Sequence, residues 1–202
     1  MKSYIFFIIC FSFVFFAQTQ DLIDKKDLPN DVRWVMHSQE YIALCEQIYD
    51  NAFQSLQHKI NKASNPLIVM DLDETVLDNS KYQKELFVTS STYNEASWNR
   101  WVKTEVSDLV PGAKKFILNY KKEKNARIIY ISNRSQVTLD ATISNMKKLG
   151  IFFDDDLFLL RANAGDSKVI RRQEVVDGTN RMVKYGPQEI IAYFGDAIGD
   201  FP

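Results

Sequence analysis

The chain has 202 residues and a formal net charge of −1, and 46% of its residues are hydrophobic and 13% aromatic. This length fits one domain, and the apolar content is enough for a buried core, which argues against an intrinsically disordered chain. Because acidic and basic residues nearly balance, the sequence lacks the basic surface that binds nucleic acid polymers, and we expect no such partner.

The N-terminal segment differs in composition from the rest of the chain. Lys2 precedes an uncharged apolar run, residues 4–17, which is too short for a membrane span and is typical of a signal peptide. We expect residues 1–19 to be a signal peptide, so the mature protein would be periplasmic, attached to the cell envelope or secreted. No stable membrane insertion is expected after cleavage, although an uncleaved anchor is the alternative. Ile9 precedes Cys10 where a lipoprotein needs a small residue, which argues against lipid attachment.

The segment that follows has the spacing of helices. Residues 31–62 carry apolar side chains at steps of three and four residues, which predicts one or two amphipathic helices. Cys45 lies among apolar neighbours at helical spacing, so we expect it to be a buried core thiol rather than a nucleophile.

Beyond residue 65, short apolar strands alternate with helices. Strands are expected at residues 66–70, 127–131, 157–160 and 189–194. Helices are expected at residues 111–124, 136–149 and 166–176, the second of them closed by Gly150. This alternation predicts an α/β fold in which helices flank a parallel sheet.

Polar residues follow three of these strands. They are Asp71 and Asp73 after the first strand, residues 132–134 after the second, and Asp196 and Asp200 after the last. Ligands of such sheets bind beyond the carboxyl ends of the strands. We therefore expect these residues, which are far apart in the sequence, to share one crevice.

The first of these motifs is Asp71-Leu72-Asp73-Glu74-Thr75. A calcium-binding loop is one alternative, but such a loop requires Gly at its sixth position and Glu at its twelfth. Val76 and Tyr82 occupy those positions, so we reject it. A solvated acidic turn remains the alternative for this motif taken alone.

The remaining motifs are weaker when each is taken alone. The run from Gly195 to Asp200 could be an ordinary turn. The hydroxyl, amide and backbone N–H groups of residues 132–134 could hold phosphate oxygens, or could belong to a plain polar loop. Lys168 begins a predicted helix, and Arg171 and Arg172 are its nearby rivals as a cationic site residue.

In their order along the chain, these four segments resemble those of the phosphatases of the haloacid dehalogenase (HAD) superfamily, and most closely the class C acid phosphatases. Residues 68–82 look like the first signature of that family and residues 192–201 like its second. The resemblance implies a Rossmannoid three-layer α/β sandwich with a parallel sheet and a small helical appendage from the N-terminal region. We expect residues 20–202 to form this domain, truncated at its C-terminus, because relatives continue beyond the second signature.

The resemblance also implies roles for individual residues. Asp71 would be the nucleophile and Asp73 the general acid/base, while Lys168 would offset charge on the phosphoryl oxygens. A carboxylate can attack phosphorus, and the acyl phosphate that results is easier to hydrolyse than the ester. The expected phosphate-binding residues are Ser132, Asn133 and Arg134.

The expected metal ligands are Asp71, the backbone carbonyl of Asp73, Asp196 and Asp200, the last directly or through water. Unit charges about 4 Å apart repel by roughly 4 kcal/mol per pair at an effective dielectric constant of about 20. Four carboxylates and a phosphate dianion therefore require a cation, and ligands that are all oxygen favour Mg²⁺. Because crowded carboxylates raise one another's pKa values, we expect an acidic pH optimum.

Small-molecule phosphate monoesters are the implied substrates, with 5′-nucleotides and nicotinamide mononucleotide favoured. Trp98 matches a family aromatic residue that packs against the base or nicotinamide ring; alternatively, Trp98 and Trp101 form one core-facing stripe of a helix. The sequence thus predicts an exported, Mg²⁺-dependent acid phosphatase that uses an aspartyl-phosphate intermediate. The alternatives are a HAD-type phosphatase for sugar or other small phosphates and a secreted, non-catalytic binding protein on the same fold. The oligomeric state is left open, a homo-oligomer included.

Overall fold

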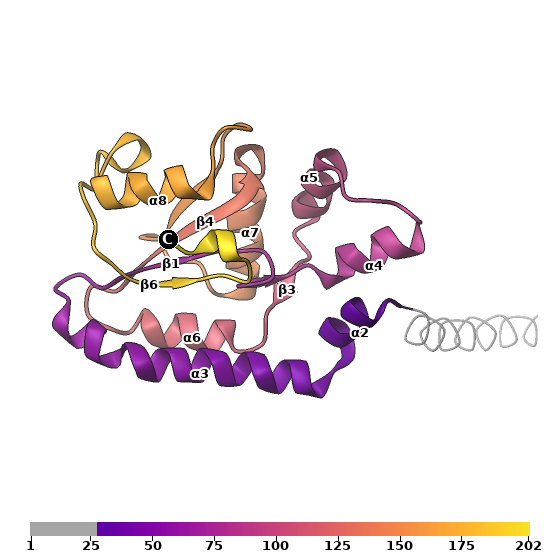
Figure 1. Ribbon diagram of the computed structural model, residues 1–202, viewed down its shortest axis with the longest axis horizontal. Coiled ribbons are helices and arrows are strands. Elements are labelled where there is room, and N and C mark those ends of the chain that lie inside the picture. The colour runs from indigo at the N-terminus through magenta and orange to yellow at the C-terminus, as the bar shows by residue number, and fades with distance from the viewer. Residues whose placement is uncertain (1–27) are drawn as a thin grey trace, which may run out of the picture.

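The computed structural model describes residues 28–202, so the predicted signal peptide and Cys10 lie outside the described residues. Its centre is a four-stranded parallel sheet in the order β5-β4-β1-β6 (Figure 1). The strands are β1 (Leu67–Met70), β4 (Arg127–Ser135), β5 (Leu157–Arg161) and β6 (Ile190–Phe194). Met70, the last residue of β1, is in register with Tyr130 of β4 and with Phe194, the last residue of β6. Strands β1 and β6 therefore end at one edge of the sheet, and β4 continues beyond it to Ser135. The predicted α/β fold with a parallel sheet is confirmed.

Helices cover both faces of the sheet. Alternate strand residues, such as Ile68 and Met70, pack into a core formed with α3 (Gln39–Lys62), α6 (Ala113–Tyr120) and α7 (Leu139–Leu149). The intervening residues, such as Val69, pack against Val175 of α8 (Lys168–Asp177) on the other face. Figure 1 shows α8 on one side of the sheet and α6 and α3 on the other. Since a parallel sheet buries both faces, its strands are apolar throughout rather than alternating.

A small helical cap stands beside the carboxyl edge of the sheet (Figure 1). It is inserted between β2 (Leu77–Asp78) and β3 (Asp108–Leu109), which pair antiparallel and close the insertion. The cap consists of α4 (Ser80–Val88) and α5 (Glu95–Thr104), and α2 (Asn30–His37) contacts α4. Of the two predicted N-terminal helices, α2 therefore joins the appendage, whereas α3 belongs to a layer of the main domain because it buries Tyr49, Leu56 and Ile60.

Several boundaries differ from the sequence prediction. Strand β4 continues through Ser135 instead of ending at Ile131. Helix α6 ends at Tyr120, and the chain turns through Asn125, whose φ of 59° is left-handed. Helix α8 begins at Lys168 because the Ser167 hydroxyl accepts a hydrogen bond from the Ile170 N–H and caps it. Cys45 is partly buried and packs against the core rather than within it, which corrects the prediction of a buried core thiol.

Three-residue 3-10 helices complete the described structure at Gln136–Thr138, Asn180–Met182 and Ile198–Asp200. Within residues 28–202, none of the helices is both long enough and apolar enough to cross a membrane.

The end of α8 depends on glycine. Gly178 has a φ of 65°, and a β carbon added there would lie 2.2 Å from backbone atoms of Gly186 and Pro187. Gly186 has a similar φ of 68°, but no described atom lies within 4 Å of its would-be β carbon. An alanine at Gly186 would therefore suffer backbone strain alone, whereas an alanine at Gly178 would suffer both backbone strain and a steric collision.

We expect Gly186→Ala to lower the free energy of unfolding by about 1–2 kcal/mol, the usual cost of left-handed backbone for a residue with a β carbon. Gly178→Ala should lower it further, because the backbone of residues 186 and 187 must also move. Urea denaturation of both variants measures the difference. Equal losses would show that the collision at Gly178 is relieved at no cost.

Candidate active site

Three carboxylates converge at the carboxyl edge of the sheet. Asp71 directly follows β1, and its N–H donates to the carbonyl of Phe194, the last residue of β6. Asp196 and Asp200 follow β6, and each of the three aspartates has one oxygen within 4.8 Å of the others. The structure therefore brings together side chains that are more than a hundred positions apart, at the edge where the sequence predicted a crevice.

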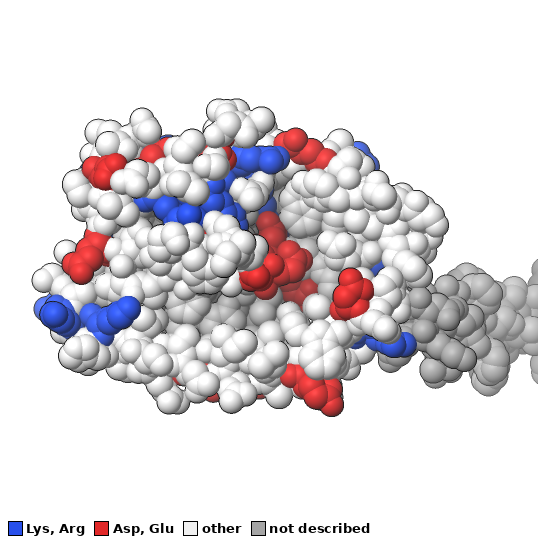
Figure 2. Space-filling model, in the orientation of Figure 1, with Lys and Arg blue, Asp and Glu red and all other residues white. Residues whose placement is uncertain are grey.

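Lys168 supplies positive charge to this cluster. It is the first residue of α8, and its Nζ lies 2.7 Å from Asp71 Oδ1 and also pairs with Asp200. The rival cations have other partners: Arg172 donates to the carbonyl of Gly199, next to Asp200, at 2.7 Å, and the buried Arg171 donates to the carbonyl of Leu159 at 3.1 Å. In Figure 2 a basic patch lies directly against an acidic one near the centre of the visible face.

Burial sets the electrostatics of the cluster. It raises the pKa of Asp71 to about 7; Lys168 opposes this rise, and the negative charge of Asp73 adds to it. Burial also raises the pKa of Asp196. For Lys168, burial disfavours the charged form, but the attraction of Asp71 and Asp200 outweighs it and raises the pKa of the ammonium. Holding these carboxylates ionised is costly without more positive charge.

The donor set fits a hard divalent cation. Three carboxylates provide only oxygen ligands, which is the preference of Mg²⁺ and similar ions. Asp71 Oδ1 is buried, and among residues 28–202 its polar contact is the ion pair with the Lys168 ammonium at 2.7 Å. A carboxylate oxygen has more than one lone pair, so beside this ion pair it can still bind a metal ion.

The carboxylate of Asp73 has different neighbours. Its Oδ1 is 2.8 Å from Nη2 of Arg134 and accepts a hydrogen bond from Nε of the same residue at 2.9 Å. Its Oδ2 accepts from the Ser132 hydroxyl at 3.2 Å. Asp71 and Asp73 are two positions apart, yet one faces a lysine and two aspartates and the other a guanidinium.

Residues 132–134, expected to bind phosphate, lie in β4, so their side chains alternate between the two faces of the strand. Ser132 and Arg134 point inward and are buried, whereas Asn133 points outward and is exposed. The Arg134 side chain is engaged by Asp73 and by Thr142 of α7, and Asn133 Oδ1 accepts a hydrogen bond from Arg171 at 2.6 Å. The extension of β4 through residue 135 produces this inward and outward alternation.

Trp98 lies in the cap beside this group. It is 8% exposed and packs edge-on against Tyr82, with ring centroids 5.0 Å apart. The guanidinium carbon of Arg134 lies 5.8 Å from the centroid of its ring. Trp101 joins the same apolar cluster, so both tryptophans pack within the cap at the border of the site.

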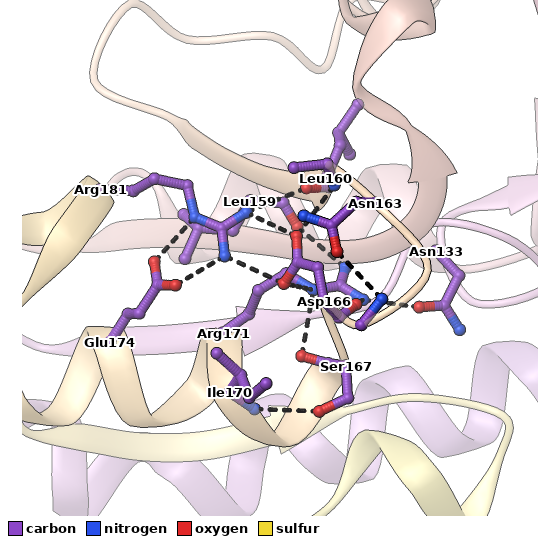
Figure 3. A network of polar contacts seen from close by, with 12 residues as sticks. Asn133, Leu159, Leu160, Asn163, Asp166, Ser167, Ile170, Arg171, Glu174 and Arg181 are labelled. Carbon is purple, nitrogen blue, oxygen red and sulfur yellow. Dashed lines mark hydrogen bonds and ion pairs between the residues drawn. The ribbon is translucent and has the colours of Figure 1, made fainter.

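A buried ionic network behind Lys168 was missed by the sequence analysis (Figure 3). Arg171, fully buried, donates to the carbonyls of Ser132, Leu159 and Asp166 and so ties α8 to the ends of β4 and β5. Arg181 pairs with both Asp166 and Glu174. Charged residues at helical spacing around Lys168 were visible in the sequence, but their inward orientation was not.

Gly195 permits the close approach of Asp200. A β carbon on Gly195 would lie 2.2 Å from Asp200 Cβ and 2.4 Å from its Oδ2, whereas one on Gly199 meets no atom of the described chain within 4 Å. The first position is therefore restricted to glycine by the site itself, and the second is not.

We expect Gly195→Ala to displace the Asp200 carboxylate and to weaken divalent-cation binding by about 10- to 100-fold, as for other losses of ligand orientation. Calorimetric titration of the folded protein with Mg²⁺ or Mn²⁺ measures the affinity. Gly199→Ala, in the same loop, should bind the ion as the parent chain does. Equal affinity in all three proteins would exclude Asp200 as a ligand.

Comparison with known proteins agrees with this geometry. Residues 3–202 match the family model described as HAD superfamily, subfamily IIIB (Acid phosphatase). The chain is similar to the crystal structure of a class C acid phosphatase from Bacillus anthracis with tungstate bound, at 30% identity and a TM-score of 0.69. The match covers 90% of this chain and 70% of that one, and a second structure of the class C acid phosphatase from Bacillus anthracis gives the same values. The chain therefore belongs to the class C acid phosphatases of the HAD superfamily, which are phosphoric monoester hydrolases.

Proposed function

We propose that this protein is an exported, Mg²⁺-dependent acid phosphatase that hydrolyses small phosphate monoesters through an aspartyl-phosphate intermediate. The observation that carries the proposal is the convergence of Asp71, Asp196 and Asp200 within 4.8 Å, with Lys168 against Asp71, in a chain of a phosphatase family. Export rests on the apolar N-terminal segment of the sequence, residues 1–19.

In the first step, a carboxylate oxygen of Asp71 attacks phosphorus and the bond from phosphorus to the ester oxygen breaks. Asp73 gives a proton to the departing oxygen, because an alkoxide is a poor leaving group. In the second step, Asp73 takes a proton from a water molecule that attacks the phosphorus. Inorganic phosphate leaves and the Asp71 carboxylate is restored.

Positive charge must balance the phosphoryl group. Lys168 pairs with Asp71 and Asp200, and in this proposal its ammonium would also contact phosphoryl oxygens. Asp71, the Asp73 backbone carbonyl, Asp196 and Asp200 would hold Mg²⁺, which when bound supplies charge neutralisation at the phosphate. The tungstate bound in the related Bacillus anthracis structure, a tetrahedral oxyanion as phosphate is, supports an oxyanion site in this family.

The substrates that we favour are 5′-nucleotides and nicotinamide mononucleotide. Their support is the resemblance of Trp98 to the family aromatic residue, together with its place in the cap at the border of the site. The phosphate-binding roles of Ser132, Asn133 and Arg134 remain part of the proposal. The Ser132 hydroxyl and the Arg134 guanidinium both contact the Asp73 carboxylate, so each would bind a phosphate oxygen beside Asp73 or in exchange for it.

Asp71→Asn is expected to lower kcat by roughly a thousandfold or more, because an amide cannot form the acyl phosphate. Hydrolysis of p-nitrophenyl phosphate by the folded, full-length chain measures the loss. Asp50→Asn, at a partly exposed position of α3 whose side chain pairs with Lys115 of α6, is the matched control and should retain activity. Chelation should abolish the activity of the parent chain, and added Mg²⁺ should restore it. Activity that survives both the substitution and chelation would refute the mechanism.

For substrate class, we expect kcat/KM to be higher for 5′-nucleotides and nicotinamide mononucleotide than for sugar phosphates, since an aromatic face stabilises a stacked ring by about 1–3 kcal/mol. Initial rates with equal concentrations of each ester, at one pH and Mg²⁺ concentration, provide the comparison. Sugar phosphates hydrolysed as fast as nucleotides would favour the general small-phosphate enzyme instead.

A further inference from the structure

Asn79 occupies a helix-capping position but does not cap the helix. It directly precedes α4, and its side chain makes no capping hydrogen bond within the described chain. The neighbouring Asp78 accepts from the Ser80 N–H at 2.7 Å instead. Asn94, at the same position before α5, behaves as expected and accepts from the Ser97 N–H at 2.9 Å. The side chain of Asn79 is therefore committed to other partners.

Those partners connect Asp73 to the cap. Asn79 is 0% exposed, and its Nδ2 donates to Asp73 Oδ1 at 2.9 Å and to the Leu77 carbonyl at 3.2 Å. Its Oδ1 accepts from the indole Nε1 of Trp101 at 3.1 Å and from the hydroxyl of Ser107 at 2.7 Å. A carboxylate can only accept and an indole can only donate, so the orientation of the amide is fixed at both ends.

The two carboxylate oxygens of Asp73 have different numbers of hydrogen-bond donors around them. Oδ1 receives Nδ2 of Asn79 and both Nε and Nη2 of Arg134, at 2.8–2.9 Å. Oδ2 receives only the longer hydrogen bond from Ser132, at 3.2 Å, among the described residues. The side chain is 18% exposed. Oδ1 is thus held in place by its donors, and Oδ2 keeps acceptor capacity for a proton that is exchanged with substrate.

We propose that Asn79 and Trp101 are positioning residues that aim Asp73 Oδ2 at the ester oxygen. This inference rests on the proposed role of Asp73 as the general acid/base. The indole N–H on α5 fixes the Asn79 amide, and the amide fixes Oδ1. As the phosphorus–oxygen bond breaks, the proton passes from Oδ2 to the departing oxygen. A proton donor acts only within hydrogen-bond reach of its target, so a small rotation of this carboxyl group reduces catalysis.

Leaving-group chemistry distinguishes positioning from a general structural role. An alkoxide must be protonated as it leaves, whereas 2,4-dinitrophenolate leaves without a proton. If the Asp73 carboxyl group is rotated away from the ester oxygen, kcat/KM therefore falls much more for alkyl phosphates than for dinitrophenyl phosphate. Loss of folded protein, or damage to the cation site, lowers both by the same factor.

The test is the dependence of kcat/KM on the leaving group across dinitrophenyl, nitrophenyl, phenyl and alkyl phosphates, at saturating Mg²⁺. Because general acid catalysis contributes about 10²–10⁴-fold, we expect Asn79→Ala to lose about 10- to 100-fold more on the alkyl ester than on the dinitrophenyl ester. Trp101→Phe removes one N–H donor and keeps an aromatic ring, and its differential loss should be about three- to tenfold. This milder variant provides the test if Asn79→Ala does not fold.

Two reference variants separate the possible failures. Asp73→Asn should show the largest difference between its loss of kcat/KM on the alkyl ester and its loss on the dinitrophenyl ester. An equal loss on both esters would refute the acid/base role of Asp73 and, with it, the proposed mechanism. Asn94→Ala removes an ordinary cap and should lower thermal stability while it leaves the leaving-group dependence unchanged. A third result is that Asp73→Asn loses more kcat/KM on the alkyl ester than on the dinitrophenyl ester while Asn79→Ala and Trp101→Phe lose equally on both. That result would overturn only the positioning role.

Discussion

Repulsion among carboxylates is the constraint on which the rest of the structure depends. Asp71, Asp196 and Asp200 are held within 4.8 Å of one another, and Asp71 and Asp200 are almost fully buried. Ionised carboxylates at such distances repel one another and destabilise the folded chain unless a cation lies close to them. Lys168 meets part of this need, and an all-oxygen cluster of this kind is suited to a divalent cation for the remainder. The parallel sheet makes the arrangement possible because it brings the ends of β1 and β6 to one edge.

The same sheet edge separates the environments of two nearby carboxylates. Asp71 faces Lys168 and the other acidic ligands, whereas Asp73 faces Arg134, Asn79 and Ser132. Different surroundings are how one site assigns different tasks to chemically identical groups. The first environment suits a carboxylate that shares a cation and attacks phosphorus. The second suits a carboxyl group whose one oxygen is fixed and whose other oxygen exchanges a proton.

Residues outside the site hold Lys168 and Asp73 in position. The Arg171 and Arg181 network ties the start of α8 to β4 and β5, and so fixes where Lys168 begins (Figure 3). The Asn79 amide connects Asp73 to the cap through Trp101. Buried polar groups that are fully hydrogen-bonded in this way give a site a single geometry, and they are costly to interrupt. Because the cap is inserted between β2 and β3, its packing reaches the site directly.

The sequence by itself determined the parallel sheet, the helices that flank it and the acidic residues at the strand ends, because apolar periodicity and strand-end motifs are local properties of the chain. It also determined the family, through two signatures that are contiguous in sequence. Tertiary structure alone decided that Arg134 turns to Asp73, 61 positions away, that Trp98 is buried in the cap, and that Asn79 leaves its helix uncapped. A polar side chain in a short motif has many partners available to it, and its choice depends on which distant segments the fold packs against it and on the cost of leaving any buried donor or acceptor unpaired.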